Sequence, residues 1–416
     1  MTVERTAGAV WYLCKYVSAP DLDRVGGRGY SIMSELAERG HEVVLITSDS
    51  NHLANPPTFE GASCRRRTGR LTMIWLRTLK YDGTGSFRRV LSWFDFEWRL
   101  FRFNARGLPR PDAVIASSLS LLTVLNGVRL KRKYHARLIL EIRDIWPLTL
   151  TEQGGVSRWH PLALMLRLVE RLGYRSADVV VGTMPNLKAH VAKSTSRPVP
   201  VLTIPQGFDP TSLTGSTDPE PLKSLGTLEG RDFVVGYVGT VGFDNALDSF
   251  FLAAAEMETD PGTAFVLVGE GSLLDGYRAQ YGHLKNLFII GGVPKREVQA
   301  VLSQFDILYF ATHPSAVWSY GQSLNKVIDY MLSGKPVIGS YSGFPSMIDE
   351  AECGVFVPAG DVEALVAEVR RFAAMSKAER AAMGKRGADW VRERRTFTQL
   401  AADYEEILFP AGAPNG

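Results

Sequence analysis

Short apolar runs rich in β-branched residues alternate with longer segments of helical periodicity along the whole chain. The runs of the first half are AVWYL, EVVLITS, TMIWL, AVIASS, RLILEI, DVVVGT and VLTIP. Those of the second half are DFVVGYVG, AFVLVG, LFIIGG, ILYFAT, KPVIGS and GVFVPAG. Strands that are apolar almost throughout and separated by helices indicate parallel sheets covered on both faces. The two sets therefore predict an α/β protein with two doubly wound, Rossmann-like domains.

Residues 206–230 separate the two sets and are rich in Pro, Gly, Ser and Thr, with little periodicity. This composition is typical of a connection, and 416 residues are enough for two domains. Helical stretches at about 362–374 and 377–408 follow the last strand. We therefore divide the chain into a domain at 1–205, a linker at 206–230, a domain at 231–385 and a final helix at 386–416. Ligands of doubly wound sheets bind beyond the carboxyl ends of the strands, so two facing sheets would place a site in the cleft between them.

The composition excludes several classes of protein. With 45% hydrophobic and 22% charged residues the chain is typical of a globular protein, and a net charge of +3 gives no argument for a nucleic-acid partner. The three cysteines share no metal-ligand spacing, so we expect a reduced, cytoplasmic protein without a metal site. There is no signal-peptide layout and no apolar run that could span a bilayer, so any contact with the plasma membrane would be peripheral, at its inner face.

The sequence SLNKVIDYMLSGKPVIGS predicts a helix, a turn and a buried strand, but it places Lys326 in the first helical turn. The helix dipole disfavours a cation there by roughly 0.3–1 kcal/mol. Ser323 is a candidate N-cap, which would leave the amides of Leu324, Asn325 and Lys326 at the helix start. These groups would suit a phosphate or diphosphate, and Asp329, on the same face as Asn325, is placed to bind ribose hydroxyls. The alternative is a surface lysine and a solvated aspartate.

A glycine-rich loop joins the first strand to a helix. Gly26 and Gly27 precede a helix that starts near Arg28, where free amides would receive an anion and the backbone could approach a ligand closely. The alternative is a turn that packs the helix onto the sheet. His52 lies just past the next strand, in the position that faces the cleft.

The second domain repeats the arrangement of strand, glycine loop and helix in YVGTVGFDNALDSF, which contains Gly239 and Thr240. In VGEGS, Glu270 also follows a strand. One loop of this kind is a weak signal, but loops at successive strand ends converge on one edge of the sheet. We therefore expect these residues at a ligand-binding edge.

Charged residues follow the strand RLILEI in the sequence EIRDIWP. A strand end in an open sheet faces the crevice, so charges there favour a functional role. Asp144 is the candidate for acid–base chemistry or for binding a hydroxyl group, and Trp146 lies two residues beyond it. Glu141 and Arg143 either contribute to the site or pair with each other.

The segment Ser86–Arg110 interleaves arginines with aromatic residues. Val90, Phe94, Trp98 and Phe101 would form one stripe along a helix. Basic amphipathic helices with aromatic residues bind anionic membrane surfaces, which predicts a peripheral membrane contact. The alternative is that the stripe packs into the protein core.

The order of these motifs resembles that of the GT-B fold glycosyltransferases, in particular the retaining enzymes of family 4 and the bacterial subgroup that builds capsule and O-antigen polysaccharides. The matching segments are GGRGYSIMSELAERGHEVVLITSDSNH, EIRDIWP, IPQGFD, YVGTVGFDNALDSF, VGEGSLL and SLNKVIDYMLSGKPVIGSYSGFPSMIDEAECGVFVPAGD. The resemblance implies two Rossmann-like domains facing across a cleft, with the acceptor in the first and a nucleotide-sugar donor in the second. It also implies a transfer that retains the anomeric configuration without a metal or cofactor, and a final helix that crosses back to the first domain.

The resemblance also assigns roles by position. The donor-binding residues would be Gly26, Gly27, Gly239, Thr240, Glu270, Ser323, Leu324, Asn325, Lys326 and Asp329. Among these, Ser323–Lys326 would hold the diphosphate, Asp329 the ribose, and Glu270 would lie near the base of the donor, for which a UDP-sugar is favoured. A glycan or lipid-linked saccharide acceptor would contact Arg28, His52, Arg143 and Trp146. Asp144 and Lys326 would act in catalysis.

Three positions depart from the family pattern. Gly321 stands where the first of two glutamates would contact the sugar. The segment GTVGFDNAL lacks the usual Arg and Lys, which leaves Lys326 as the evident cation, and Arg143 and Asp144 occur where a histidine is often found. Gly321 keeps open the alternative of a non-catalytic subunit that binds nucleotide sugars for a transferase, and a nucleotide-sugar epimerase is a further alternative.

Overall fold

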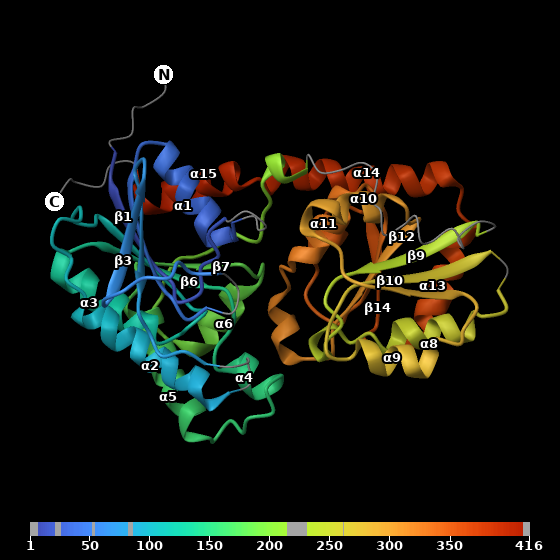
Figure 1. Cartoon of the computed structure of the whole chain (residues 1–416), viewed down its shortest axis with the longest axis horizontal. Coiled ribbons are helices and arrows are strands. Elements are labelled where there is room, and N and C mark those ends of the chain that lie inside the picture. The colour runs from blue at the N-terminus through green and yellow to red at the C-terminus, as the bar shows by residue number, and fades with distance from the viewer. Residues whose placement is uncertain are drawn as a thin grey trace. The chain divides into compact units, whose positions relative to one another are not determined.

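The computed structural model describes residues 7–20, 26–51, 55–81, 86–213, 231–260 and 262–410. The chain forms two compact units (Figure 1). Unit 1 comprises Met1–Pro205 and Phe397–Gly416, and unit 2 comprises Gln206–Thr396. Each unit is a largely parallel sheet covered by helices, which confirms the predicted α/β fold with two Rossmann-like domains.

Unit 1 is built on an eight-stranded sheet with the order β3-β4-β2-β1-β5-β6-β7-β8. Its strands are β1 (Ala9–Leu13), β2 (Glu42–Ser48), β3 (Ser63–Thr68), β4 (Leu71–Leu76), β5 (Ala113–Ser117), β6 (Arg137–Ile142), β7 (Val179–Gly182) and β8 (Val201–Thr203). Neighbouring strands are parallel except for β3, which is antiparallel to β4. The strand order reverses between β1 and β5, and ligands of doubly wound sheets bind at such a switch point.

Helices cover both faces of this sheet. They are α1 (Arg28–Glu38), α2 (Phe87–Arg102), α3 (Thr123–Tyr134), α4 (Leu148–Glu152), α5 (Pro161–Ser176), α6 (Leu187–Ser194) and α15 (Phe397–Leu408). Helices α1 and α15 pack together on one face, and α2, α3 and α5 cover the other (Figure 1). Tyr12, Leu36, Leu45 and Leu400 belong to the buried core under α1 and α15. Strands that are apolar on both sides require this double cover.

Strand β3, with the sequence SCRRRT, was not predicted because its residues are polar and largely exposed. It is an edge strand, joined to β4 by a tight turn in which Gly69 has a φ of 58°. An edge strand can be polar because one side of it is open to solvent, and its charges discourage pairing with other chains. Its partner β4 contains the predicted strand TMIWL and is buried.

Unit 2 contains a six-stranded parallel sheet with the order β11-β10-β9-β12-β13-β14. Its strands are β9 (Phe233–Val238), β10 (Thr263–Val268), β11 (Leu287–Ile290), β12 (Ile307–Ala311), β13 (Val337–Ser340) and β14 (Gly354–Val357). Its helices are α8 (Asp248–Glu256), α9 (Leu274–Tyr281), α10 (Val298–Ser303), α11 (Asn325–Leu332), α12 (Met347–Glu350), α13 (Val362–Ala374) and α14 (Lys377–Arg394). Short 3₁₀ helices are η1 (Pro210–Leu213), η3 (Phe243–Asn245), η4 (Lys295–Glu297) and η5 (Ala316–Tyr320). One core of this unit includes residues of α8 and α13, and the other includes residues of α10, α11 and α14.

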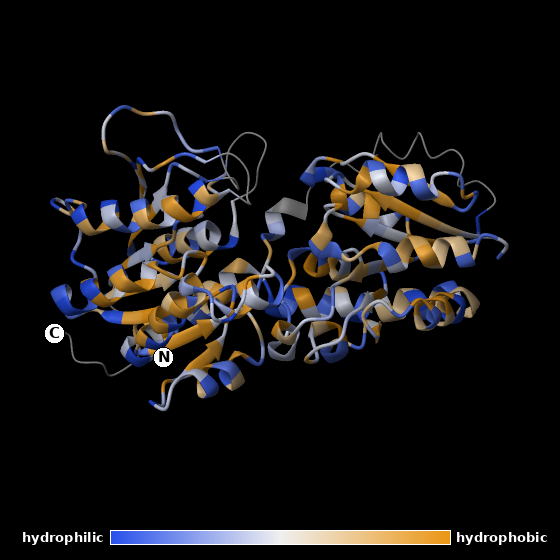
Figure 2. Ribbon diagram, turned by 90° about the horizontal axis from the view of Figure 1, so that it is seen from below, coloured by the Kyte–Doolittle hydropathy of each residue, from blue (hydrophilic) through white to orange (hydrophobic). Residues whose placement is uncertain are grey.

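Hydropathy follows the layers of each unit. Figure 2 shows the strands of both sheets as mainly hydrophobic, whereas hydrophobic and hydrophilic residues alternate along many of the helices. This is the pattern of helices that turn one face to a sheet and the other to solvent. Within the described ranges, no helix is long and apolar enough to cross a membrane.

The boundaries of the units differ in part from the predicted ones. Phe208, assigned to the linker, is buried in the core of unit 2, and residues 214–230 lie outside the described part of the chain. The single helical stretch predicted at 377–408 is two helices, because α14 ends at Arg394 and α15 begins at Phe397. Residues 386–396 were assigned to the returning helix, but they belong to unit 2, where Val391 packs in the core. The return to unit 1 therefore begins at Phe397.

Candidate functional site

Two glycine loops of unit 2 pack against each other at the carboxyl ends of β9 and β10. The N–H of Val241 donates to the carbonyl of Glu270 at 2.8 Å. A Cβ atom at Gly269 would lie 1.9 Å from the carbonyl oxygen of Gly239, so a larger residue would force the loops apart. The structure thus brings Gly239, Thr240 and Glu270, predicted to bind the donor, to one edge of the sheet.

Lys326 is the second residue of α11, and its side chain reaches the loop that follows β9. Its ammonium group donates to the Tyr237 hydroxyl at 3.0 Å and to the side-chain oxygen of Asn245, and it lies 4.8 Å from the centroid of the Tyr237 ring. Burial lowers the pKa of Lys326 to about 8. Among the described residues no carboxylate pairs with this lysine, and its charge faces neutral oxygens and a ring. An anionic ligand would supply the missing counter-charge.

The start of α11 differs from the prediction. Leu324, and not Ser323, is the N-cap residue. The Ser323 hydroxyl accepts a hydrogen bond from the N–H of Gln206 at 2.8 Å, and the side-chain oxygen of Gln322 accepts one from the N–H of Leu324 at 3.1 Å. The predicted Ser323 cap is therefore wrong, because this hydroxyl is held by the chain that enters unit 2. The first amides of α11 still lack a partner within the helix.

Gln322 and Gly321 precede α11, and of these only Gln322 was not singled out in the sequence. Gln322 is 4% exposed, and its side-chain NH₂ group has no hydrogen-bond partner among the described residues. An unpaired buried donor costs about 1–3 kcal/mol, so it favours a bound molecule at this place. Gly321 has φ of 93° and ψ of 179°, a conformation open essentially only to glycine. A glutamate at this position would therefore require a different backbone.

Asp329 lies one turn further along α11, where its carboxylate forms an ion pair with Lys295. Lys295 lies in η4, which follows β11, and the pair is partly exposed, with 54% of the Lys295 side chain and 20% of the Asp329 side chain accessible. Glu270 is exposed, and its side chain lies against Gly292 in the same loop after β11. The sequence analysis identified the strand LFIIGG, but it did not recognise Lys295, which follows this strand, as a site residue.

Gly26 and Gly27 allow the loop before α1 to pack closely. The N–H of Gly27 donates to the carbonyl of Ser18 at 2.8 Å, and a Cβ atom at Gly27 would lie 3.3 Å from that of Ser18. A Cβ atom at Gly26 would lie 2.7 Å from the ring of Tyr30. Packing thus explains both glycines, which favours the structural alternative for this loop, and donor binding by it stays a prediction.

Arg28 was predicted to contact the acceptor, but the structure places it in the interior of unit 1. Its guanidinium pairs with Glu141 and donates to the carbonyl of Ile204 at 2.7 Å. The hydroxyls of Tyr12 and Tyr404 donate to the same carboxylate at 2.8 and 2.6 Å. Burial opposes ionisation of Glu141, but the charges of Arg28 and Arg143 and its hydrogen bonds lower its pKa to about 2. Arg28 is therefore a buried structural cation, and Glu141 pairs with it rather than with Arg143.

The other residues after β6 keep unused hydrogen-bonding groups. Within the described part of the chain, the guanidinium of Arg143 and the carboxylate of Asp144 have no hydrogen-bond partner, and the buried indole N–H of Trp146 has none either. Burial raises the pKa of Asp144, whereas the positive charges of Arg143 and Arg89 lower it. Trp146 packs edge-on against Trp93 of α2 with ring centroids 5.6 Å apart. These three side chains, beyond the carboxyl end of β6 and next to β5, can meet a polar ligand.

Lys15, which follows β1 in unit 1, is a buried cation that sequence reasoning missed. It is fully buried, and its ammonium group donates to the carbonyl of Ser50 at 3.2 Å and lies 4.8 Å from the Tyr16 ring centroid. Burial lowers the pKa of Lys15 to about 7, against the opposing effect of the Glu97 and Asp49 carboxylates. The only signal in the sequence was a single lysine directly after an apolar strand.

His52, the remaining predicted acceptor-binding residue, lies outside the described residues. The three cysteines are free, and two of them, Cys14 and Cys353, are buried. No group of three or more His, Cys, Asp or Glu side chains in the described ranges is arranged to hold a metal ion.

Solved structures with the same fold cover nearly the whole chain. A sucrose-phosphate synthase from Thermosynechococcus elongatus superposes with a TM-score of 0.72 at 16% identity, over 96% of this chain and 98% of that one. A trehalose-6-phosphate protein from E. coli bound with UDP-2-fluoro glucose gives 0.71 at 13% identity, over 97% and 99%. Anabaena Alr3699/HepE in complex with UDP-glucose gives 0.65 at 13% identity, over 96% and 99%. The first two are not described as capsule or O-antigen enzymes, so that subgroup stays a prediction.

Family models match both units of the chain. Residues 28–207 match the glycosyl transferase 4-like domain, and residues 232–374 match the glycosyl transferases group 1. No curated protein matches the chain closely enough to count as a relative. The two matched domains occur in the order that the motifs predicted, and the fold agrees with that of the solved structures. The chain is therefore a glycosyltransferase with the GT-B fold.

Proposed function

We propose that this protein moves a sugar from a nucleoside diphosphate sugar, a UDP-sugar being the favoured donor, to a glycan or a lipid-linked saccharide in the synthesis of a cell-surface polysaccharide. In this proposal the transfer retains the anomeric configuration and needs no metal ion. Lys326 is the observation that carries it. This half-buried cation lacks a carboxylate partner among the described residues and lies beside the glycine loop after β9, where a diphosphate would supply the counter-charge.

The start of α11 supplies further groups suited to a diphosphate. Its first amides have no helical partner, its dipole favours an anion, and the buried NH₂ group of Gln322 is unpaired among the described residues. Positioned donors of this kind stabilise the charge that develops on a departing nucleoside diphosphate. The solved structures that contain UDP-glucose and UDP-2-fluoro glucose support a UDP-sugar as the donor.

Asp329 and Glu270 would bind the nucleoside part of the donor. Asp329 lies one helical turn beyond Lys326, and a carboxylate there can accept hydrogen bonds from both ribose hydroxyls. Its ion pair with Lys295 is partly exposed, so hydroxyls can reach the carboxylate without a large change in structure. Glu270, at the end of β10, would lie near the base.

The residues after β6 would serve the acceptor. We propose that Asp144 orients or deprotonates the acceptor hydroxyl, since burial raises its pKa and so strengthens it as a base. Arg143 and Trp146 have unused hydrogen-bond donors that acceptor oxygens would satisfy. In a retaining transfer the hydroxyl attacks on the face from which the nucleotide leaves. If Asp144 only orients the hydroxyl, the proton passes to the departing phosphate; if Asp144 acts as the base, the carboxylate takes it.

The test is transfer of labelled sugar from a panel of nucleotide sugars to a lipid-linked acceptor in the presence of EDTA. We expect a UDP-sugar to give a product with the anomeric configuration of the donor, and Lys326→Ala to abolish turnover while the chain stays folded. The exposed Lys285→Ala is the matched control. A strict requirement for a divalent metal, or an inverted product, would contradict the proposal.

A non-catalytic subunit that binds nucleotide sugars is the second candidate. Gly321 favours it, because its backbone conformation excludes the glutamate that contacts the transferred sugar in the family pattern. Stabilisation of the chain by UDP, with no transfer and no donor hydrolysis under any condition of the panel, would support this candidate. Conversion of the donor without an acceptor would instead indicate an epimerase.

We also propose that unit 1 contacts an anionic membrane, at the inner face of the plasma membrane, through residues 86–110. Helix α2 in this segment is apolar on two sides. Trp93, Phe96 and Leu100 are buried, so one side packs into the core. The exposed side carries Phe87, Leu91, Phe94, Trp98 and Phe101, of which Phe87 is 74% accessible. Exposed apolar patches of this kind favour an interaction site.

Charge complementarity favours a membrane as the partner of this exposed stripe. Arg88 and Arg102 of α2 are exposed. Of the two acidic residues of the helix, Asp95 forms an ion pair with Arg99 and Glu97 is buried. Helix α5 adds exposed leucines at 164, 168 and 172, and α3 packs against both helices. Aromatic side chains between arginines suit the headgroup region of an anionic bilayer.

Vesicle flotation tests this contact. We expect binding to vesicles of phosphatidylglycerol with phosphatidylcholine, and at least tenfold weaker binding after Arg88→Glu with Arg102→Glu or after Trp98→Ala with Phe87→Ala. The control is Lys385→Glu with Arg392→Glu, which reverses two exposed charges in unit 2. Equal loss in the control, or equal binding to neutral vesicles, would contradict the proposal, and a change from dimer to monomer in the α2 variants would assign the stripe to self-association.

A further inference from the structure

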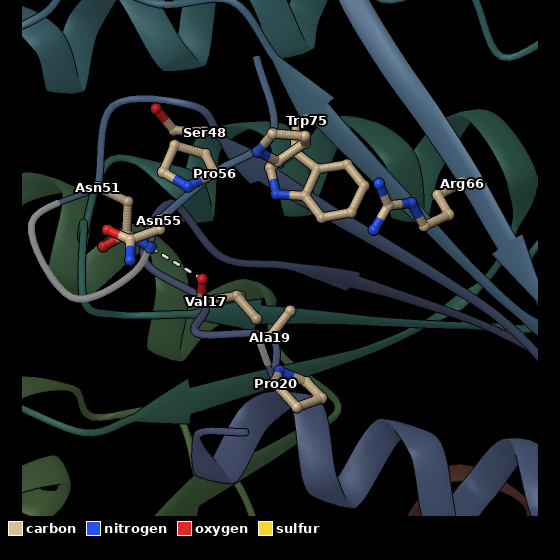
Figure 3. Close-up of a pocket in the computed structure, with 10 residues that line it drawn as sticks. Val17, Ala19, Pro20, Ser48, Asn51, Asn55, Pro56, Arg66 and Trp75 are labelled. Atoms are coloured by element: carbon tan, nitrogen blue, oxygen red, sulfur yellow. Dashed lines mark hydrogen bonds between the residues drawn. The ribbon is translucent and has the colours of Figure 1, made fainter. Parts of the chain in front are cut away.

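A pocket of about 160 Å³ opens in unit 1 beyond the ends of β1 and β2 and beside the β3–β4 hairpin (Figure 3). Its lining includes Val17, Asn51, Asn55, Arg66 and Trp75. An engineered cavity of about 150 Å³ admits one benzene ring, so this pocket has room for one six-membered ring. It lies apart from the residues after β6 that we assign to the acceptor hydroxyl, none of which line it.

Arg66 differs from the other arginines of its hairpin. Arg65 donates to the carbonyl of Gly107, and Arg67 and Arg70 both donate to the carboxylate of Glu42. The Arg66 guanidinium has no hydrogen bond or ion pair with any described residue and lies 5.8 Å from the Trp75 ring centroid. It is therefore near the face of an aromatic ring but has no carboxylate partner among the described residues. A guanidinium without a counter-charge of its own can receive a carboxylate or a phosphate.

The strand register explains why Arg66 alone meets the pocket. Arg66 lies opposite Met73 in the antiparallel pair, and Trp75 lies opposite Cys64, so Arg66 and Trp75 are diagonal neighbours on one face. Arg65 and Arg67 point to the other face because side chains alternate along a strand. Figure 3 shows the Arg66 and Trp75 side chains next to each other on the hairpin.

The remaining lining suits a ring that carries hydroxyl groups. Asn51 donates to the Val17 carbonyl at 2.8 Å, which fixes its amide beside the pocket (Figure 3). Asn55 is exposed and has no hydrogen bond with the described residues. Trp75 is 6% exposed, and its indole N–H has no hydrogen-bond partner in the described ranges. Amide and indole groups beside apolar walls are the usual lining of a site for a small polar molecule.

We propose that this pocket binds an acidic monosaccharide unit of the acceptor, a six-membered sugar ring that carries a carboxylate or a phosphate. The acid pairs with Arg66, the ring lies against Trp75 and Val17, and its hydroxyls bond to Asn51 and Asn55. This inference rests on the proposed function only in that it assigns the bound sugar to the acceptor. It adds that acceptors with an acidic unit are preferred over neutral ones.

Titration of the full-length protein with three sugars tests the pocket without any transfer reaction. The probes are glucuronic acid, glucose 6-phosphate and methyl glucoside, and binding is followed by calorimetry. We expect at least one acidic sugar to bind about tenfold or more tightly than the neutral one, and the one that binds identifies the acid as carboxylate or phosphate. Arg66→Ala should remove this preference, because charge-assisted hydrogen bonds contribute about tenfold to a hundredfold in affinity.

Arg65→Ala is the matched control, one residue away on the opposite face of the same strand. It should leave binding unchanged, and both variants should fold because both side chains are exposed. Equal binding of the acidic and neutral sugars, or equal losses of affinity in the two variants, would contradict the proposal that this pocket selects an acidic sugar. Acid-selective binding without any sugar transfer would support the proposed sugar site but contradict the proposed transfer. Transfer to neutral acceptors that does not change in Arg66→Ala would support the proposed transfer but contradict the proposed sugar site.

Discussion

Arg28 in unit 1 and Lys326 in unit 2 invite comparison, although their helices follow different strands of the two sheets, β1 and β12. Each is a cation in the first turn of a helix, where the dipole is unfavourable, and each was predicted to bind a ligand. Arg28 is fully buried and paired with the carboxylate of Glu141. Lys326 faces a hydroxyl, an amide oxygen and a ring, without a carboxylate among the described residues.

The presence of a paired carboxylate distinguishes a cation with a structural role from a cation that is available to bind a ligand. A cation buried with its own carboxylate is already neutralised, so a ligand has little to add. A cation that contacts only neutral oxygens loses more free energy on desolvation than these contacts restore. Binding of an anion therefore stabilises it. The comparison predicts that damage to the Arg28 pair will appear in stability, and that damage to Lys326 will appear in donor binding.

The largest expected effect is on the Arg28 pair. Glu141→Ala should lower the free energy of unfolding of unit 1 by about 3–5 kcal/mol, because it leaves a buried guanidinium without its counter-charge. Hydrogen exchange at the amides of β6 reports this loss for unit 1 alone. Glu42→Ala is the control, since its carboxylate pairs with exposed Arg67 and Arg70 and should cost about 1 kcal/mol or less. Similar losses in the two variants would remove the distinction between the two cations.

Lys326→Ala should show the opposite pattern. Removing this ammonium group should weaken UDP binding by about tenfold to a hundredfold, the contribution of charge-assisted hydrogen bonds. The free energy of unfolding of unit 2 should change by less than about 1 kcal/mol, because a half-buried charge without a counter-charge is lost together with its hydrogen bonds. Calorimetry with UDP and hydrogen exchange at β9 measure the two quantities. A folded variant with unchanged UDP affinity would make Lys326 a structural cation like Arg28.

Asp329→Ala should have a smaller effect, about tenfold on UDP affinity, because it removes hydrogen bonds to neutral hydroxyls. The selective readout is 2′-deoxy-UDP, which should bind the unmodified protein more weakly than UDP but bind the variant equally well. Lys295→Ala frees the Asp329 carboxylate and is the matched control, with UDP affinity unchanged or higher. Discrimination between the two nucleotides that survives Asp329→Ala would place the ribose elsewhere.

The fold was predictable because its signal is repeated along the chain. Every parallel strand has an apolar run that can be recognised without knowing its neighbours, and two such sets fix the fold class. Strand β3 escaped because an edge strand need not be apolar, and the break between α14 and α15 escaped because both helices have continuous helical composition. The unit to which residues 386–396 belong depends on tertiary packing, such as that of Val391, which no local pattern encodes.

The location of the candidate site was predictable from the sequence, but the contacts that its residues make were less so. Strand ends located the edge that holds Gly239, Glu270 and Lys326 correctly, because carboxyl ends of parallel strands meet at one edge. Which groups pair across that edge depends on contacts between distant segments. The link from Ser323 to Gln206 and the ion pair of Asp329 with Lys295 join residues far apart in sequence, and so does Arg28 with Glu141.

The smallest expected effect is on pH dependence, and it separates the two cations by titration. Burial lowers the pKa of Lys326 from 10.5 to about 8. Between these values the unfolded chain binds more protons than the folded one, so the Lys326 contribution makes the free energy of unfolding rise with pH. The Arg28 pair does not titrate there, because the pKa of Glu141 is lowered to about 2 and that of Arg28 is raised.

UDP affinity should therefore fall as pH rises above about 8, since a neutral amine offers no charge to the diphosphate. Bound diphosphate raises the pKa of Lys326, so the fall begins at a higher pH than in the free protein. Tyr237, which contacts the ammonium group, stays neutral because burial raises its pKa. Lys326→Arg keeps its charge at these pH values, so its UDP affinity should stay nearly constant between pH 7 and 9.5 when measured by calorimetry. A parallel fall in this variant would assign the titration to another group, and Lys326 would then lose the feature that distinguishes it from Arg28.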